Sequence, residues 1–273
     1  ILRNFIGGML ATQMGQTIGA LASSSKGAHD AALPIIENFK PSLSPQALRK
    51  FGAELQIPET EIAIYFALRE AATVRLFESN PWLVAYMKAA IAEYGKGIHI
   101  DLDEIQRQAE ESMRNIQENL ELNPESENPI NLNAEFSLAL NNGLFTPEET
   151  PQQAAALEKL ETALALIDGW IEEVINLAAS DRLPSLAALS ELLRRERVSN
   201  SPIQQLFKAL FNLEVSPRKV REATFFWSEV RKSKGLDARD KIWSGLLPTA
   251  KELTDPIAFL SSTEIPDDLS GLL

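Results

Sequence analysis

The feature that most constrains the fold is a run of apolar residues between positions 157 and 178. Their spacing alternates between three and four: Leu157, Leu160, Leu164, Ile167, Ile171, Val174 and Ala178. This spacing places them on one face of an α-helix, as a packing seam of about three heptads. The sequence therefore predicts a long helix over residues 151–179 that lies against other helices.

Other helices are predicted by a capping side chain followed directly by Pro at the first helical position. This pair occurs at Ser44-Pro45, Asn80-Pro81, Thr150-Pro151, Ser201-Pro202 and Ser216-Pro217. Thr150 and Gln153 also fit a capping box. Together with the apolar periodicity, these signals predict helices at 44–55, 58–79, 81–94, 102–121, 151–179, 184–198, 202–212 and 217–233. No segment alternates apolar and polar residues for long, so the predicted fold is mainly α, a multi-helix fold with little or no sheet.

One long polar connection, residues 123–142, separates an N-terminal half from a C-terminal half. We expect a single helical domain over residues 1–273, with two lobes divided near 123–142 as the alternative. The tail from Leu247 onward contains several Pro residues and is predicted to be an irregular surface segment.

Composition excludes several classes of function. The chain has 273 residues with a net charge of -12, which disfavours binding to nucleic acid or to anionic membrane surfaces. It has no Cys, so it has no disulfide, thiol nucleophile or Cys-ligated metal, which fits a cytoplasmic location. The two histidines, His29 and His99, are expected to be an ordinary loop residue and a hydrogen-bonded residue before a helix cap.

The opening segment from Phe5 to Ala22 is uncharged and carries a small residue at every fourth position, at Gly7, Ala11, Gly15 and Gly19. That pattern gives one smooth helix face on which another backbone can lie closely. Polar residues such as Gln13 interrupt the apolar run that a membrane span needs. We therefore predict a packed helix without a transmembrane span, which could also join two copies of the chain.

The helix predicted at 58–79 carries the main candidate for chemistry. Arg69-Glu70-Ala71-Ala72-Thr73 has the outline of H-E-x-x-H, a motif in which two His hold zinc and the Glu activates its water. Glu70 stands at the general-base position, while Arg69 and Thr73 stand where the two His would be. The outline is thus present without its metal ligands.

Several stretches together resemble the zincin-like metallopeptidase family of actinobacteria and their relatives. They include Met14-Gly15-Gln16, Tyr65 to Ala72, Arg75-Leu76-Phe77, Pro81-Trp82-Leu83, Gly143 to Pro147, Leu160-Glu161-Thr162, Asp168-Gly169-Trp170 and Leu247 to Ala250. The resemblance implies a zincin-like fold, a hydrolase activity and zinc. It also implies that Asp168 aligns with the third metal ligand, a Glu in members with a complete motif.

The resemblance further implies that Arg69 and the long helix face one another. Arg69 shares a face with Ile62, Phe66, Thr73 and Leu76, so its charge needs a buried anion. We expect that anion to be Asp168 or Glu161, with the guanidinium in the place of a metal. The alternative is that Arg69 extends to solvent. Gly169 next to Asp168 is expected to let another element approach the helix backbone closely.

Two functions follow. The first is a family member that has lost zinc and catalysis, has no cofactor, and binds an unknown protein or peptide or has a structural role. The alternative is an active zinc-dependent peptidase or hydrolase that uses Glu70 with ligands not identifiable in the sequence. Whether the chain is an enzyme is left open by the residues themselves.

Overall fold

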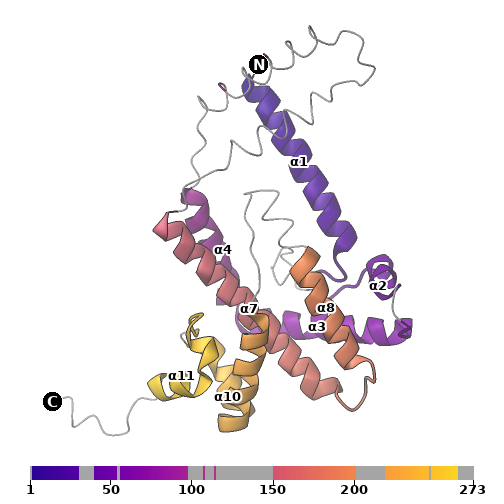
Figure 1. Ribbon diagram of the computed structural model, residues 1–273, viewed down its shortest axis with the longest axis vertical. Coiled ribbons are helices and arrows are strands. Elements are labelled where there is room, and N and C mark those ends of the chain that lie inside the picture. Colours follow the sequence, from indigo (N-terminus) through magenta and orange to yellow (C-terminus); the bar gives the residue numbers. More distant parts are fainter. Residues whose placement is uncertain are drawn as a thin grey trace, which may run out of the picture. The chain divides into compact units, whose positions relative to one another are not determined.

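The computed structural model describes residues 2–30, 40–53, 56–97, 107, 114, 150–200, 219–245 and 247–263 (Figure 1). Within these ranges the chain is helical, and its β structure is limited to an isolated bridge between Gly27 and Leu43. The prediction of a mainly α fold is therefore confirmed.

The α-helices are α1 (Leu2–Ser24), α2 (Pro45–Gly52), α3 (Glu59–Ser79), α4 (Trp82–Lys96), α7 (Pro151–Ala179), α8 (Leu186–Asn200), α10 (Val220–Lys241) and α11 (Pro256–Thr263). Two 3-10 helices, η1 (Ile242–Ser244) and η2 (Glu252–Thr254), lie between α10 and α11. The prediction for α7 has the observed bounds, and those for α2, α3, α4 and α8 lie within a few residues. The helix predicted at 202–212 and the connection 123–142 fall outside the described residues. Of the helix predicted at 102–121 only Arg107 and Arg114 are described, and both are helical.

The chain divides into two compact units. The smaller spans residues 92–156 and the larger comprises 1–91 and 157–273. In the smaller unit the backbone N–H of Gln153 donates to the Thr150 hydroxyl at 3.2 Å, and the Thr150 N–H donates to the Gln153 side chain at 3.1 Å. These reciprocal bonds are the predicted capping box, which satisfies two free backbone donors at the start of α7.

The seam of α7 lies in the hydrophobic core of the larger unit. Leu160, Leu164, Ile167 and Ile171 are buried in one cluster with apolar residues of α3, α4, α8 and α10. The seam departs from the prediction at its end, where Ala178 is exposed and Ala179 is buried. A straight helix has 3.6 residues per turn, so a buried stripe drifts away from a strict seven-residue repeat.

Gly169 brings α7 and α10 close together. A methyl group on Gly169 would lie 2.7 Å from both the Ala223 Cβ and the Thr224 nitrogen of α10. Any larger residue would therefore push the two helices apart. The expected close approach of another element at Gly169 is confirmed. Further along, α10 bends at Gly235, whose φ of 86° is readily adopted only by glycine. The predicted end of this helix near 233 thus corresponds to a bend in α10.

All four tryptophans of the chain gather in one cluster of the larger unit. Trp243 stacks on Trp227 with ring centroids 5.0 Å apart and meets Trp170 edge-on at 6.5 Å. Its carbonyl accepts a hydrogen bond from the Trp82 indole at 2.9 Å. The cluster joins the start of α4, the middle of α7, the first half of α10 and η1.

The expectation that α1 packs closely through its small residues is wrong for the part of that face that the structure describes. Ala11, Gly15 and Gly19 are exposed, and no described residue lies within 4 Å of a methyl group placed on Gly15 or Gly19. No described helix has the length and apolar character needed to cross a membrane.

The prediction of an irregular tail is also wrong for residues 252–263, which form η2 and α11. The Asp255 side chain accepts the Ala258 backbone N–H at 3.0 Å, with Pro256 at the first helical position. This is the same capping pair that marks the other helices, so the signal was present in the sequence.

Replacing Leu164 by Ala is expected to lower the free energy of unfolding by about 2–5 kcal/mol, because it removes a buried side chain from the core. Chemical denaturation measures the loss. Leu177→Ala is the matched control on the same helix, since Leu177 is 46% exposed. Equal effects of the two substitutions would show that the α7 seam is not the core.

Candidate functional site

The site begins with the buried face of α3. Ile62, Phe66, Arg69, Thr73 and Leu76, which the sequence places on one face, are all buried. Arg69 is only 7% exposed, so it does not extend to solvent. A guanidinium in such a place needs an acceptor, because an unpaired buried charge is very costly.

The acceptor is Asp168 of α7, which is 4% exposed. Arg69 Nη2 donates to Asp168 Oδ1 at 2.6 Å, and the guanidinium also lies over the Tyr65 ring at 5.8 Å. Glu161, the other acceptor considered, is half-buried two turns earlier in α7 and is not among the residues that line the pocket.

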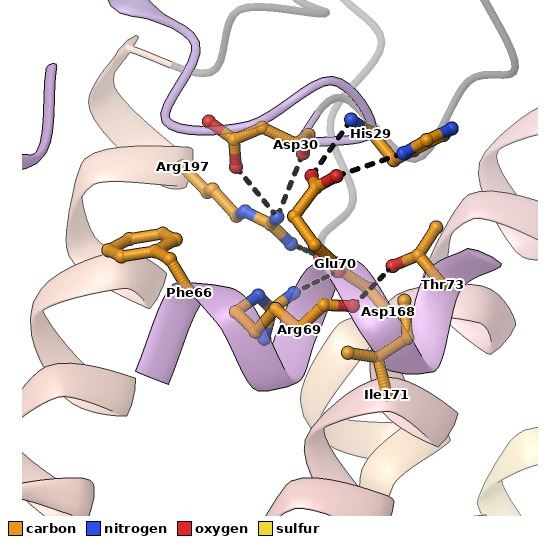
Figure 2. Close-up of a pocket in the computed structure, with 9 residues that line it drawn as sticks. All are labelled: His29, Asp30, Phe66, Arg69, Glu70, Thr73, Asp168, Ile171 and Arg197. Atoms are coloured by element: carbon orange, nitrogen blue, oxygen red, sulfur yellow. Dashed lines mark hydrogen bonds and ion pairs between the residues drawn. The ribbon is translucent and has the colours of Figure 1, made fainter. Parts of the chain in front are cut away.

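A second guanidinium, that of Arg197 in α8, shares the same carboxylate. Arg197 Nη1 pairs with Asp168 Oδ2, while its Nη2 donates to the Asp30 carbonyl at 3.0 Å and lies 3.5 Å from the Asp30 carboxylate. Burial, and then the like charge of Arg69, lowers the pKa of Arg197 to about 10, so the group remains charged at neutral pH. Asp168 therefore connects α3, α7 and α8 (Figure 2).

Glu70, the residue at the general-base position, is engaged by His29. The backbone N–H of His29 donates to Glu70 Oε1 at 2.9 Å, and His29 Nδ1 lies 2.9 Å from Glu70 Oε2. The His29 side chain is fully buried, so its description as an ordinary loop residue is wrong. Gly27 makes this approach possible, because a methyl group there would overlap the Glu70 carboxylate.

Thr73, at the second His position, turns its hydroxyl back to its own helix. Thr73 Oγ1 donates to the Arg69 carbonyl at 2.8 Å. The residue is buried and lines the pocket together with Ile171 of α7. Its hydroxyl is therefore occupied by a helix carbonyl and is not directed at a reacting group.

Sequence reasoning missed three residues of the site: His29, Asp30 and Arg197. Arg197 lies in the run Arg194-Arg195-Glu196-Arg197, a composition typical of a solvated helix face. The only signal for His29 is the scarcity of histidine in the chain. All three residues reach the site through tertiary contacts.

The pocket between these side chains is small and highly charged. Its lining residues are His29, Asp30, Phe66, Arg69, Glu70, Thr73, Asp168, Ile171 and Arg197. The space left among them holds about one water molecule. The pocket as it stands can order a water beside three carboxylates and two guanidiniums, but it has no room for a peptide.

The residues of this pocket do not fit a zinc ion. A zinc site of the H-E-x-x-H type needs two neutral imidazoles and a free carboxylate. Here Arg69 is a cation, Thr73 is bonded to its helix, and both oxygens of Asp168 pair with guanidiniums. No group of three His, Cys, Asp or Glu placed to hold a metal occurs in the part of the chain that the structure describes.

Replacing Asp168 by Ala is expected to lower the free energy of unfolding by about 3–5 kcal/mol, because it leaves two buried guanidiniums without their shared acceptor. Glu229→Ala is the control, since Glu229 pairs with Lys232 at the surface and its loss should cost under about 1 kcal/mol. Denaturation of both variants measures the difference. A loss in Asp168→Ala as small as in the control would contradict the buried three-helix pairing.

Comparison with known proteins places the chain in a family. A family model described as zincin-like metallopeptidase matches residues 1–260, whereas no curated protein and no solved structure matches the chain. The family implies zinc, which corrects the expectation that the chain has no cofactor. Because the pocket around Asp168 does not fit zinc, the residues that would bind a zinc ion would have to lie outside that pocket. With almost its whole length matched, the chain belongs to the zincin-like metallopeptidase family.

Proposed function

We propose that this family member acts by binding a protein or peptide, and that the pocket on α3 no longer hydrolyses a substrate. The observation that carries the proposal is the Asp168 carboxylate shared by Arg69 and Arg197. In a hydrolytic site a carboxylate in this place would hold a metal or act on water. Here its two oxygens hold the guanidiniums of two other helices.

The state of Glu70 supports the same proposal. A general base must be within hydrogen-bond reach of the water that it activates, and that water must reach the substrate. Both oxygens of Glu70 are engaged by His29, and the pocket is too small for a substrate. In this closed state the pocket therefore works as a polar connection between helices and holds no substrate.

One observation favours a second candidate, a hydrolase that uses Glu70. His29 Nδ1 lies 2.9 Å from Glu70 Oε2, and a paired imidazole and carboxylate are a common acid–base unit. Such an enzyme would activate a water held in the pocket after a rearrangement that admits substrate. It needs His29 and Glu70 in reach of that substrate, which the closed pocket does not provide.

Peptide cleavage discriminates between the two candidates. The purified 273-residue chain is incubated with a mixture of unstructured peptides, with and without added zinc, and products are followed by mass spectrometry. The proposal predicts no cleavage by the wild-type chain in either condition. Cleavage that persists in Glu78→Gln, an exposed position on the same helix, but is lost in Glu70→Gln would overturn it.

Association of two copies through α1 also remains a prediction. Its support is that Gly15 and Gly19 are exposed, so no residue that the structure describes covers this part of the small-residue face. Gly15→Leu is expected to leave folding unchanged and to weaken any self-association measured by sedimentation, whereas Gln16→Leu, exposed beside that face, should not. Equal sedimentation of both variants and the wild type would remove this face as a contact.

The other expectations about partners and location stay predictions. The net charge of -12 argues against nucleic acid as the partner. A cytoplasmic location is consistent with the lack of Cys.

A further inference from the structure

A short segment of the chain lies in the pocket in the way that a bound ligand would. This segment, Ser25–Asp30, follows α1 and is called the strap below. Figure 2 shows its last two residues, His29 and Asp30, pointing to Glu70 and to Arg197. His29 uses both its backbone N–H and its ring on Glu70, and Asp30 offers a carbonyl and a carboxylate to Arg197.

Lys26 of the strap also pairs with a residue of opposite charge. Lys26 Nζ lies 2.6 Å from Glu196 Oε2 of α8, and the lysine is itself 3% exposed. The strap thus places three side chains opposite complementary groups on α3 and α8. The Lys26 ammonium meets a carboxylate, the His29 imidazole meets a second carboxylate, and the Asp30 carboxylate meets a guanidinium. Such charge complementarity is typical of specific recognition between a peptide and its binding surface.

The backbone of the strap pairs with residues 42–44 around Gly27 and then turns, since residues 28–30 form a turn in which the Asp30 N–H donates to the Gly27 carbonyl at 3.4 Å. Ser44 N–H donates to the Lys26 carbonyl at 2.8 Å, and Ala28 N–H donates to the Ser42 carbonyl at 3.2 Å. Gly27 forms the isolated bridge with Leu43 between them. Pairing of main-chain groups with a neighbouring extended segment is a common way of binding peptides.

The contacts of the strap described above are hydrogen bonds and ion pairs. On its N-terminal side the strap continues into α1, along which Ala11, Gly15 and Gly19 are exposed. Moving the strap would therefore not require those positions of α1 to leave a packed interface. It would, however, leave Glu70 buried without its partner, which is costly. The strap is thus more readily exchanged for a similar ligand than simply released.

We propose that the strap is an internal, autoinhibitory occupant of the pocket, and that a peptide of the same chemistry displaces it. That peptide carries a basic residue for Glu196, a donor for Glu70, and a carbonyl with a carboxylate for Arg197. The inference rests on the proposed binding function and names the class of ligand. It also makes access to the pocket depend on displacing Ser25–Asp30.

The first test uses the wild-type chain and a blocked synthetic peptide, acetyl-Lys-Gly-Ala-His-Asp-amide, which copies residues 26–30 of the strap without terminal charges. Hydrogen exchange is followed at the Ala28 and His29 amides, whose donors are bonded to Ser42 and Glu70. An excess of peptide is expected to speed exchange at both amides. The control peptide, acetyl-Lys-Gly-Ala-Ala-Asn-amide, should leave both rates unchanged.

The second test weakens the strap and leaves the helices intact. In the variant His29→Ala, Asp30→Ala the labelled peptide should bind at least about tenfold more tightly than to the wild type, because the internal competitor is lost. Binding is measured by fluorescence anisotropy. Gly27→Ala is a second variant, whose added methyl overlaps the Glu70 carboxylate and should act in the same direction if the double variant fails to fold.

The possible results separate this inference from the proposed function. No effect of the peptide on exchange, with equal affinity for the wild type and a folded strap variant, would overturn the strap as a displaceable occupant. Equal binding of the control peptide would also overturn it. Cleavage of the displacing peptide, abolished by Glu70→Gln, would instead support displacement and overturn the non-hydrolytic function.

Discussion

The shared carboxylate of Asp168 is the interaction on which the arrangement of the site depends. It accepts one guanidinium from α3 and another from α8, so three helices meet at a single buried group. A buried ion pair contributes little net stability compared with apolar packing, yet breaking one side of it is costly. The core along α7 therefore supplies the stability, and the charges determine which faces of α3 and α8 meet it. Because Arg197 also binds Asp30, the Asp168 carboxylate indirectly fixes the position of the strap.

The sequence predicted the local parts of this structure well. The bounds of α7 and the buried face of α3 follow from periodicity and capping residues, which depend only on near neighbours. The need of Arg69 for an anion follows from its place on an apolar face, and the resemblance to the family narrowed that anion to Asp168 or Glu161. The choice between them depends on how α3 and α7 are set against each other. The second cation, Arg197, could not be foreseen, since its sequence neighbours are those of an exposed helix.

The predictions that were wrong also concern features that depend on contacts between distant parts of the chain. His29 was missed because a loop residue is buried only when its loop is fixed by distant groups, here Glu70. The small-residue face of α1 allows close packing but does not require it, and Gly15 is exposed. The helix beginning at Pro256 was the one avoidable error, because Asp255-Pro256 carries the capping pair that was recognised elsewhere. The resemblance to the family identified α3 as the helix that carries the candidate site, but the side chains around α3 determine what the pocket can hold.

The gathering of all four tryptophans has a consequence for how this protein can be observed. They form one cluster around Trp243, and none of them lines the pocket on α3. Intrinsic fluorescence therefore reports on the contacts among α4, α7 and α10 as a single optical signal. Movement of the strap would leave that emission unchanged unless the cluster itself were disturbed. A dye or a new tryptophan in the strap itself, for example at Ser25, would be needed to make its motion visible.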